Sequence, residues 1–96
     1  MTEIEVRRTG DGEDRSRFEV LVTEPDGSAS FDVTLSRADR DRLAGGYPSE
    51  EAFIRACFGF LLQREPRGSI LRSFDVGVIA SYFPEFERAI RRTEPR

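Results

Sequence analysis

Three stretches near the N-terminus alternate apolar and polar residues with the period of a β-strand. The apolar series begin at Ile4, at Phe18 and at Phe31. Alternation at a period of two places the apolar side chains on one face of a sheet and the polar ones on the other. The strands predicted in this way cover about residues 2–8, 17–24 and 29–35.

The connection between the second and third stretches specifies a tight turn. Pro25 presets φ, Asp26 offers a side-chain acceptor, and Gly27 tolerates positive φ. The three strands should therefore form an antiparallel meander, whose apolar face needs a covering layer.

The rest of the chain carries helix signals. Ser36 and Ser49 are suitable N-caps, and Pro66 ends the longest apolar helical pattern. The helices predicted from these signals cover about residues 37–44, 50–64, 67–73, 76–82 and 84–92. Residues 76–82 are also compatible with a fourth strand, because they begin with a β-branched run, although we favour a helix.

The fold class predicted from these elements is α+β. It consists of a three-stranded antiparallel β-meander followed by three to five helices packed on one face. One domain should cover residues 1–92, and residues 93–96 should form a disordered tail.

The longest predicted helix has more apolar surface than the sheet alone can cover. Phe53, Cys57 and Phe58 belong to a stripe with helical spacing, whereas Phe60 falls outside it. A second layer must therefore cover Phe60, and either the last helices or another subunit can supply it.

Three segments of the helical half resemble those of small, uncharacterised prokaryotic proteins with a β-rich start. The segments are 60–66, 69–75 and 82–86, and the resemblance spans roughly residues 31–87. It implies an α+β fold and no particular activity.

The composition excludes several chemistries. The chain has no His and a single Cys, Cys57, so it cannot assemble a Ser-His or Cys-His nucleophile or a conventional zinc site. Cys57 lies mid-helix among apolar residues, which favours an inert core thiol. We therefore expect no catalytic residue, no cofactor and no metal site, and a protein that is not an enzyme.

The N-terminus lacks the layout of a signal peptide, and the longest apolar run, residues 56–62, is too short to cross a bilayer. We expect a cytoplasmic protein with no membrane contact. With a net charge of −3, the chain lacks the concentrated positive charge that non-specific DNA binding uses, so nucleic-acid binding is only weakly supported.

Arginines near Pro66 and in the last helix form the first candidate site. They could contact an anion, a nucleic acid or an acidic partner, although a solvated face that complements helix dipoles also explains them. The candidates are Arg64, Arg67, Arg72, Arg88, Arg91 and Arg92.

An aromatic group forms the second candidate site. If exposed in the monomer, it would mark an interface, and if buried it belongs to the core. Its members are Phe60, Tyr82, Phe83 and Phe86. The sequence therefore predicts a non-catalytic protein-interaction or regulatory module that binds itself as a homodimer or binds another protein. The alternative is a small nucleic-acid-binding regulator of the antitoxin type.

Overall fold

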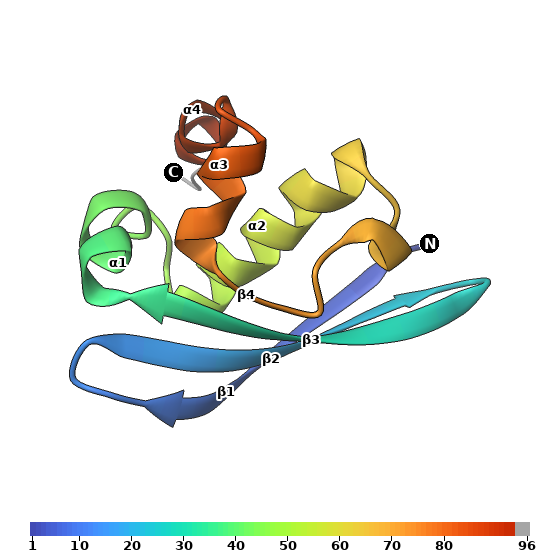
Figure 1. Cartoon of the computed structure of the whole chain (residues 1–96), viewed down its shortest axis with the longest axis horizontal. Helices are drawn as coiled ribbons and strands as arrows, with labels where there is room; N and C mark the ends of the chain where they lie inside the picture. The colour runs from blue at the N-terminus through green and yellow to red at the C-terminus, as the bar shows by residue number, and fades with distance from the viewer. Residues whose placement is uncertain (94–96) are drawn as a thin grey trace.

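A computed structural model of the chain describes residues 1–93 and shows an α+β fold with all helices on one face of a sheet (Figure 1). Residues 94–96, most of the predicted tail, lie outside the described part. The sheet has four strands in the order β1-β2-β3-β4. They are β1 (Glu3–Asp11), β2 (Arg15–Glu24), β3 (Gly27–Ser36) and β4 (Ser73–Asp75).

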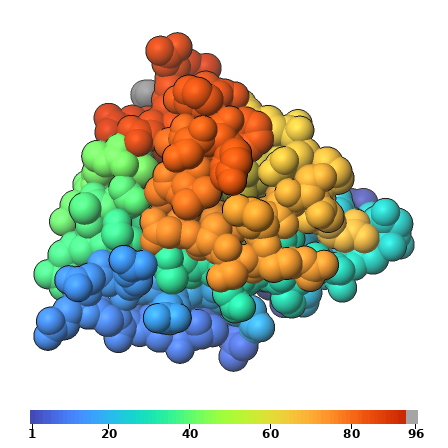
Figure 2. Space-filling model, in the orientation of Figure 1, coloured from blue at the N-terminus to red at the C-terminus, as the bar shows by residue number. Residues whose placement is uncertain are grey.

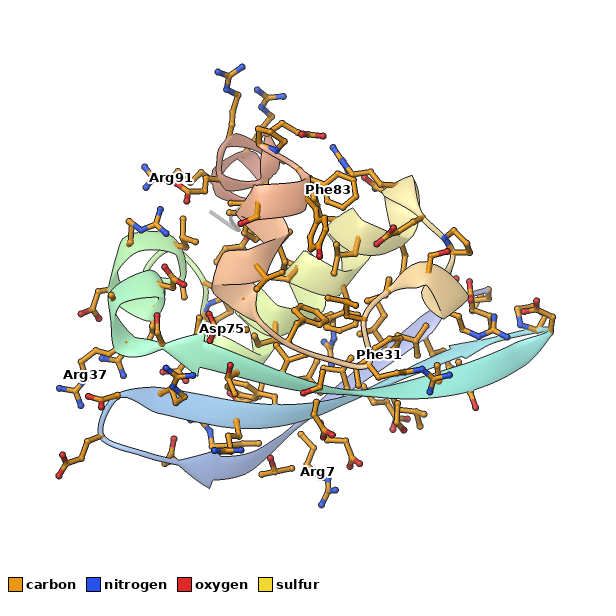
Figure 3. The ribbon with its side chains drawn as sticks, in the orientation of Figure 1. Arg7, Phe31, Arg37, Asp75, Phe83 and Arg91 are labelled. Atoms are coloured by element: carbon orange, nitrogen blue, oxygen red, sulfur yellow. The ribbon has the colours of Figure 1, made fainter. Side chains whose placement is uncertain are left out.

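The first three strands form the predicted antiparallel meander. Phe18 in β2 lies opposite Val33 in β3, and Ile4 in β1 lies opposite Val22. The β2 side chains alternate between buried and more exposed positions, as the sequence pattern requires. Figure 3 shows Phe31 pointing toward the helices and Arg7 pointing away from them on the open face.

The fourth strand corrects the prediction of a purely antiparallel, three-stranded sheet. β4 runs parallel to β3, with Asp32 opposite Ser73 and Thr34 opposite Asp75. The helix predicted over 67–73 is therefore wrong beyond its first turn, since only the 3₁₀ turn η1 (Arg67–Ser69) forms. The hydrogen bonds to the free edge of β3 join segments that are distant in the sequence, and they outweigh the weak helical pattern of this segment.

The covering layer begins with α1 (Arg37–Leu43) and the long helix α2 (Glu50–Arg64). The backbone N–H groups of Asp39 and Ala52 donate to the Ser36 and Ser49 side chains, which cap the two helices. α2 covers the predicted range and lays its apolar stripe on the sheet, where Phe58 packs 5.1 Å from Phe31 between ring centroids.

The last part of the chain forms short elements that lie across α2. They are the 3₁₀ turn η2 (Val76–Val78), α3 (Ile79–Tyr82) and α4 (Phe86–Arg92). Residues 76–82 are thus helical, and the strand lies just before them. Figure 2 shows this segment in orange and red, between α1 in green and the end of α2 in yellow.

Candidate protein-interaction site

The four aromatic candidates separate into core and surface. Phe60 and Phe86 are buried, with ring centroids 5.1 Å apart, and Phe83 packs edge-on against Phe60 at 5.8 Å. The Arg64 guanidinium lies 3.6 Å from the centroid of the Phe60 ring. α3 and α4 thus supply the second layer that Phe60 needs, and only Tyr82 and Phe83 reach the surface.

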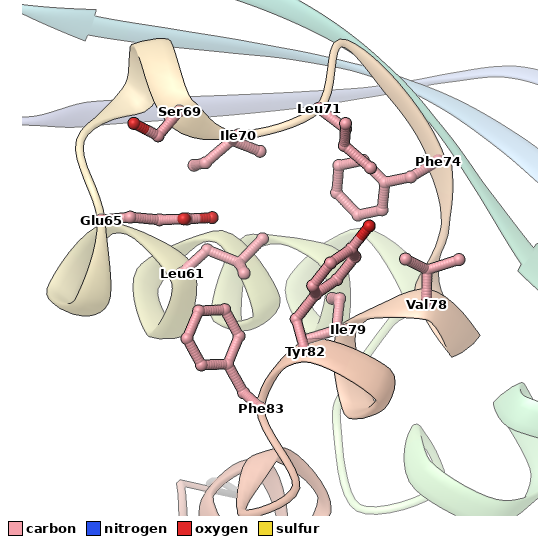
Figure 4. Close-up of a pocket in the computed structure, with 10 residues that line it drawn as sticks. All are labelled: Leu61, Glu65, Ser69, Ile70, Leu71, Phe74, Val78, Ile79, Tyr82 and Phe83. Atoms are coloured by element: carbon pink, nitrogen blue, oxygen red, sulfur yellow. The ribbon is translucent and has the colours of Figure 1, made fainter.

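Tyr82 and Phe83 border an apolar pocket of about 270 Å³ between the end of α2, the 69–74 segment and α3. Figure 4 shows the lining side chains converging on one space. Beside Tyr82 and Val78, its apolar lining comprises Leu61, Ile70, Leu71, Phe74, Ile79 and Phe83.

The pocket has exposed apolar side chains at its rim. Leu71 is 50% exposed and Tyr82 is 65% exposed, and Met1 is the other large apolar residue in residues 1–93 with such exposure. Leu71 and Tyr82 therefore lie at the same pocket, although they are eleven positions apart in the sequence. Clustering of this kind is typical of a contact surface, whereas single scattered apolar residues need no explanation.

One carboxylate points into this apolar pocket. The Glu65 side chain extends toward its centre (Figure 4) and is partly buried. No ion pair or side-chain hydrogen bond of Glu65 occurs within residues 1–93. Glu65 therefore gives the pocket a negative group that a cationic group of a ligand could meet.

A small polar network fixes the wall formed by β4. The Thr34 hydroxyl lies 2.6 Å from Asp75 Oδ1, and the Gly77 backbone N–H donates to Asp75 Oδ2 at 3.0 Å. Asp75 thus ties β4 to β3 and caps η2 at the same time. This arrangement holds Phe74 and Val78 on one side of the pocket.

Two of the six candidate arginines are engaged in structural contacts. Besides covering Phe60, Arg64 Nε lies 3.2 Å from Glu85. Arg67 Nη1 lies 2.7 Å from Glu24 and 2.9 Å from Asp26, which ties η1 to the β2–β3 turn. These two therefore stabilise the monomer.

The other four arginines are exposed. Arg91 donates to the Arg42 carbonyl oxygen, and Figure 3 shows Arg91 at the outer side of the helical layer. Within residues 1–93 there is no ion pair of Arg72, Arg88, Arg91 or Arg92. The structure places three of these on α4 and Arg72 before β4, so the six candidates do not form one cluster.

A charged cluster that the sequence patterns did not reveal lies at the opposite end of the sheet. Arg8 Nη1 lies 2.6 Å from Asp11, and its Nη2 lies 3.1 Å from Glu50 and 3.4 Å from Glu51. Hydrogen bonding from Arg8 lowers the pKa of Asp11. Because these charges satisfy one another, we assign the cluster to stability, as a link between β1 and the start of α2.

The single thiol of the chain lies in the core. Cys57 is buried, and desolvation raises the pKa of its thiol above the ordinary value. Within the described residues, no group of three or more His, Cys, Asp or Glu side chains is placed to bind a metal ion. No helix of residues 1–93 has the length and apolar character needed to span a membrane.

Comparison of the chain with protein-family models, curated proteins and solved structures found no significant match. The resemblance to small prokaryotic α+β proteins therefore stays a prediction. Sequence reasoning identified Tyr82 and Phe83 but missed Glu65, Leu71 and Phe74. Their convergence depends on the parallel pairing of β4, which leaves no local signal in the sequence.

Proposed function

We propose that this chain is a non-catalytic protein-interaction module that binds its partner through the apolar pocket beside Tyr82. The observation that supports this is the pairing of an apolar pocket with the exposed side chains of Leu71 and Tyr82 at its rim. Burial of such a surface by a partner removes apolar area from water, which is the main driving force of association.

The pocket lies at the lower size limit of metabolite and cofactor sites. Its volume of about 270 Å³ lies just below the range of roughly 300–1,000 Å³ that is typical of small-molecule sites. Its size and apolar lining suit one or two apolar side chains of a partner protein. The partner is either a second copy of the chain or another protein.

Two measurements on one set of variants test this function. The variants are Leu71→Arg and Tyr82→Arg, with Thr23→Arg on the open face of the sheet as the matched control, because all three positions are exposed. Light scattering measures the mass in solution against the monomer mass of 10.9 kDa. A library of displayed random peptides is selected on the wild type after depletion on Leu71→Arg, which leaves Tyr82→Arg as an independent test.

The proposal predicts one of two results. Either the wild type is a dimer that Leu71→Arg and Tyr82→Arg convert to a folded monomer, or the selection yields peptides that bind the wild type and the Thr23→Arg control but neither pocket variant. A monomeric wild type that yields no such peptide would contradict the proposal.

Nucleic-acid binding through α4 is the second candidate function. It is supported by the exposed side chains of Arg88, Arg91 and Arg92, which lack carboxylate partners within residues 1–93. The net charge of −3 counts against it. Fluorescence anisotropy with a labelled DNA duplex at two salt concentrations tests it, since phosphate contacts predict binding that weakens steeply with salt and with loss of these arginines.

A further inference from the structure

β4 is an edge strand, and most of its outward-facing backbone groups are not paired with a neighbouring strand. The Asp32 backbone N–H donates to the Arg72 carbonyl oxygen at 2.8 Å, and Asp32 pairs with Ser73 in a parallel register. In a parallel ladder of this register, the N–H and C=O of Phe74 face β3. Those of Ser73 and the N–H of Asp75 point away from the sheet, and no strand of residues 1–93 pairs with them. The Asp75 C=O accepts the first hydrogen bond of η2, because Asp75 is the N-cap of that turn.

The opposite edge of the sheet is protected. On β1, Glu3, Glu5 and Arg7 alternate along the strand, and Arg55 from α2 donates to the Ile4 carbonyl oxygen at 3.2 Å. Charged side chains and covered backbone groups are common means of preventing strand addition at an edge. Beside β4, Arg72 is charged, but the Asp75 carboxylate is engaged by Thr34 and Gly77, and Leu71 is apolar and exposed.

The free edge of β4 lies at the pocket. Leu71 and Phe74 contribute to the lining, together with Tyr82 from α3 (Figure 4). A strand added to β4 would direct every second side chain toward the layer that Phe74 faces, because side chains alternate across a sheet. Those side chains would enter the pocket, while the backbone would pair with Ser73 and Asp75.

We propose that β4 accepts an extended segment of a partner protein as a fifth strand, with a large apolar side chain in the pocket and a Lys or Arg beside Glu65. This inference rests on the proposed function. Main-chain hydrogen bonds would supply affinity, and the pocket would supply specificity. The uncompensated Glu65 carboxylate selects a basic neighbour, because an opposite charge in a partly buried apolar site is favoured over a neutral group.

The first test is an N-methyl scan of the tightest pocket-dependent peptide from the display selection. Strand addition predicts alternation: methylation of every second peptide amide lowers affinity about fivefold or more, because it removes a hydrogen bond to β4, whereas the intervening positions tolerate it. Losses that recur every three to four residues would indicate a helical ligand and overturn the inference.

Amide hydrogen exchange in the protein supplies an internal control. Binding of the same peptide should slow exchange at Ser73 or Asp75, whose N–H groups face the free edge. It should change Phe74 little, because that N–H already faces β3. Unchanged exchange at both outward-facing amides would also overturn the inference.

The role of Glu65 is tested by a double-mutant cycle. Glu65→Gln and replacement of the peptide Lys or Arg by Met should each weaken binding several-fold, and the double change should cost little more than either alone. The control is Glu13→Gln, in the exposed turn after β1. Additive losses in the cycle would show that Glu65 does not interact with the basic side chain of the peptide.

These outcomes separate the two proposals. Failure to find either pocket-dependent peptides or pocket-dependent self-association contradicts the proposed function itself. Peptides that bind at the pocket without backbone alternation contradict strand addition alone. Self-association through the pocket without peptide binding likewise supports the function and overturns the inference.

Discussion

The Thr34–Asp75 contact should determine whether β4 stays on the sheet. Asp75 accepts a hydrogen bond from Thr34 at 2.6 Å and another from the Gly77 backbone N–H at 3.0 Å. Asp75→Ala removes both, whereas Thr34→Val removes only the first and preserves the shape of the side chain. The two variants therefore separate strand attachment from capping of η2.

The magnitude follows from these two contacts. Loss of an N-cap side chain costs about 1 kcal/mol, and loss of a partly buried hydrogen bond to a charged group costs about 1.5 kcal/mol or more. Asp75→Ala should thus lower the free energy of unfolding by about 2.5 kcal/mol, which for a chain of this size corresponds to a melting temperature lower by about 10–20 °C.

Urea unfolding followed by circular dichroism measures these energies for the wild type, both single variants and the double variant. Because Thr34→Val already removes the shared hydrogen bond, Asp75→Ala should cost only about 1 kcal/mol in that background, giving a coupling of about 1.5 kcal/mol. A loss below about 0.5 kcal/mol for Asp75→Ala, or strict additivity, would refute the assignment of β4 to the edge of β3.

Three further predictions concern positions away from the pocket. Gly27 has φ of 150°, and a Cβ added there would lie 2.5 Å from Arg67 Nη2. Gly27→Ala should therefore lower the free energy of unfolding by about 1–3 kcal/mol. Gly59 has open space around it, so Gly59→Ala should raise the free energy of unfolding slightly. Thermal unfolding of the pair checks this, and equal effects would contradict it. Cys57 should react with a thiol reagent only as fast as the protein opens, and rapid native-state labelling would refute its burial. Hydrogen bonding from Arg67 lowers the pKa of Asp26, so the stability from this contact should be complete above the ordinary value of 3.8 and be lost as pH falls through the lower folded value. The Arg67→Gln variant should lack this contribution when its unfolding is measured as pH is lowered. A pH profile of stability equal to that of the wild type would argue against the pair.

The strands and the long helix were predictable because their signals are local. Alternation from Phe18 and from Phe31 sets the buried face of the meander, and Ser49 and Pro66 bound α2 in the sequence as they do in the structure. Each signal depends on residues within one element.

The parallel strand and the pocket were not predictable in this way. The spacing of Ile70 and Phe74 suits a helix, and only pairing with β3 makes the segment extended. The sequence also left open whether the last helices or another subunit cover Phe60, because helical spacing shows that a side chain needs cover but not which element supplies it. The exposed positions of Leu71 and Tyr82 become neighbours only after β4 is in place.

The affinity of a pocket-dependent displayed peptide for three forms of the protein tests the central proposal most directly. Fluorescence anisotropy with a labelled peptide would compare the wild type, Tyr82→Arg and the Thr23→Arg control, after circular dichroism shows that all three are folded. The pocket account predicts that Tyr82→Arg weakens binding about tenfold or more, because a charge then replaces an exposed aromatic at the rim, and that Thr23→Arg leaves the affinity unchanged. Equal affinities for the wild type and Tyr82→Arg, or an equal loss in both variants, would contradict it.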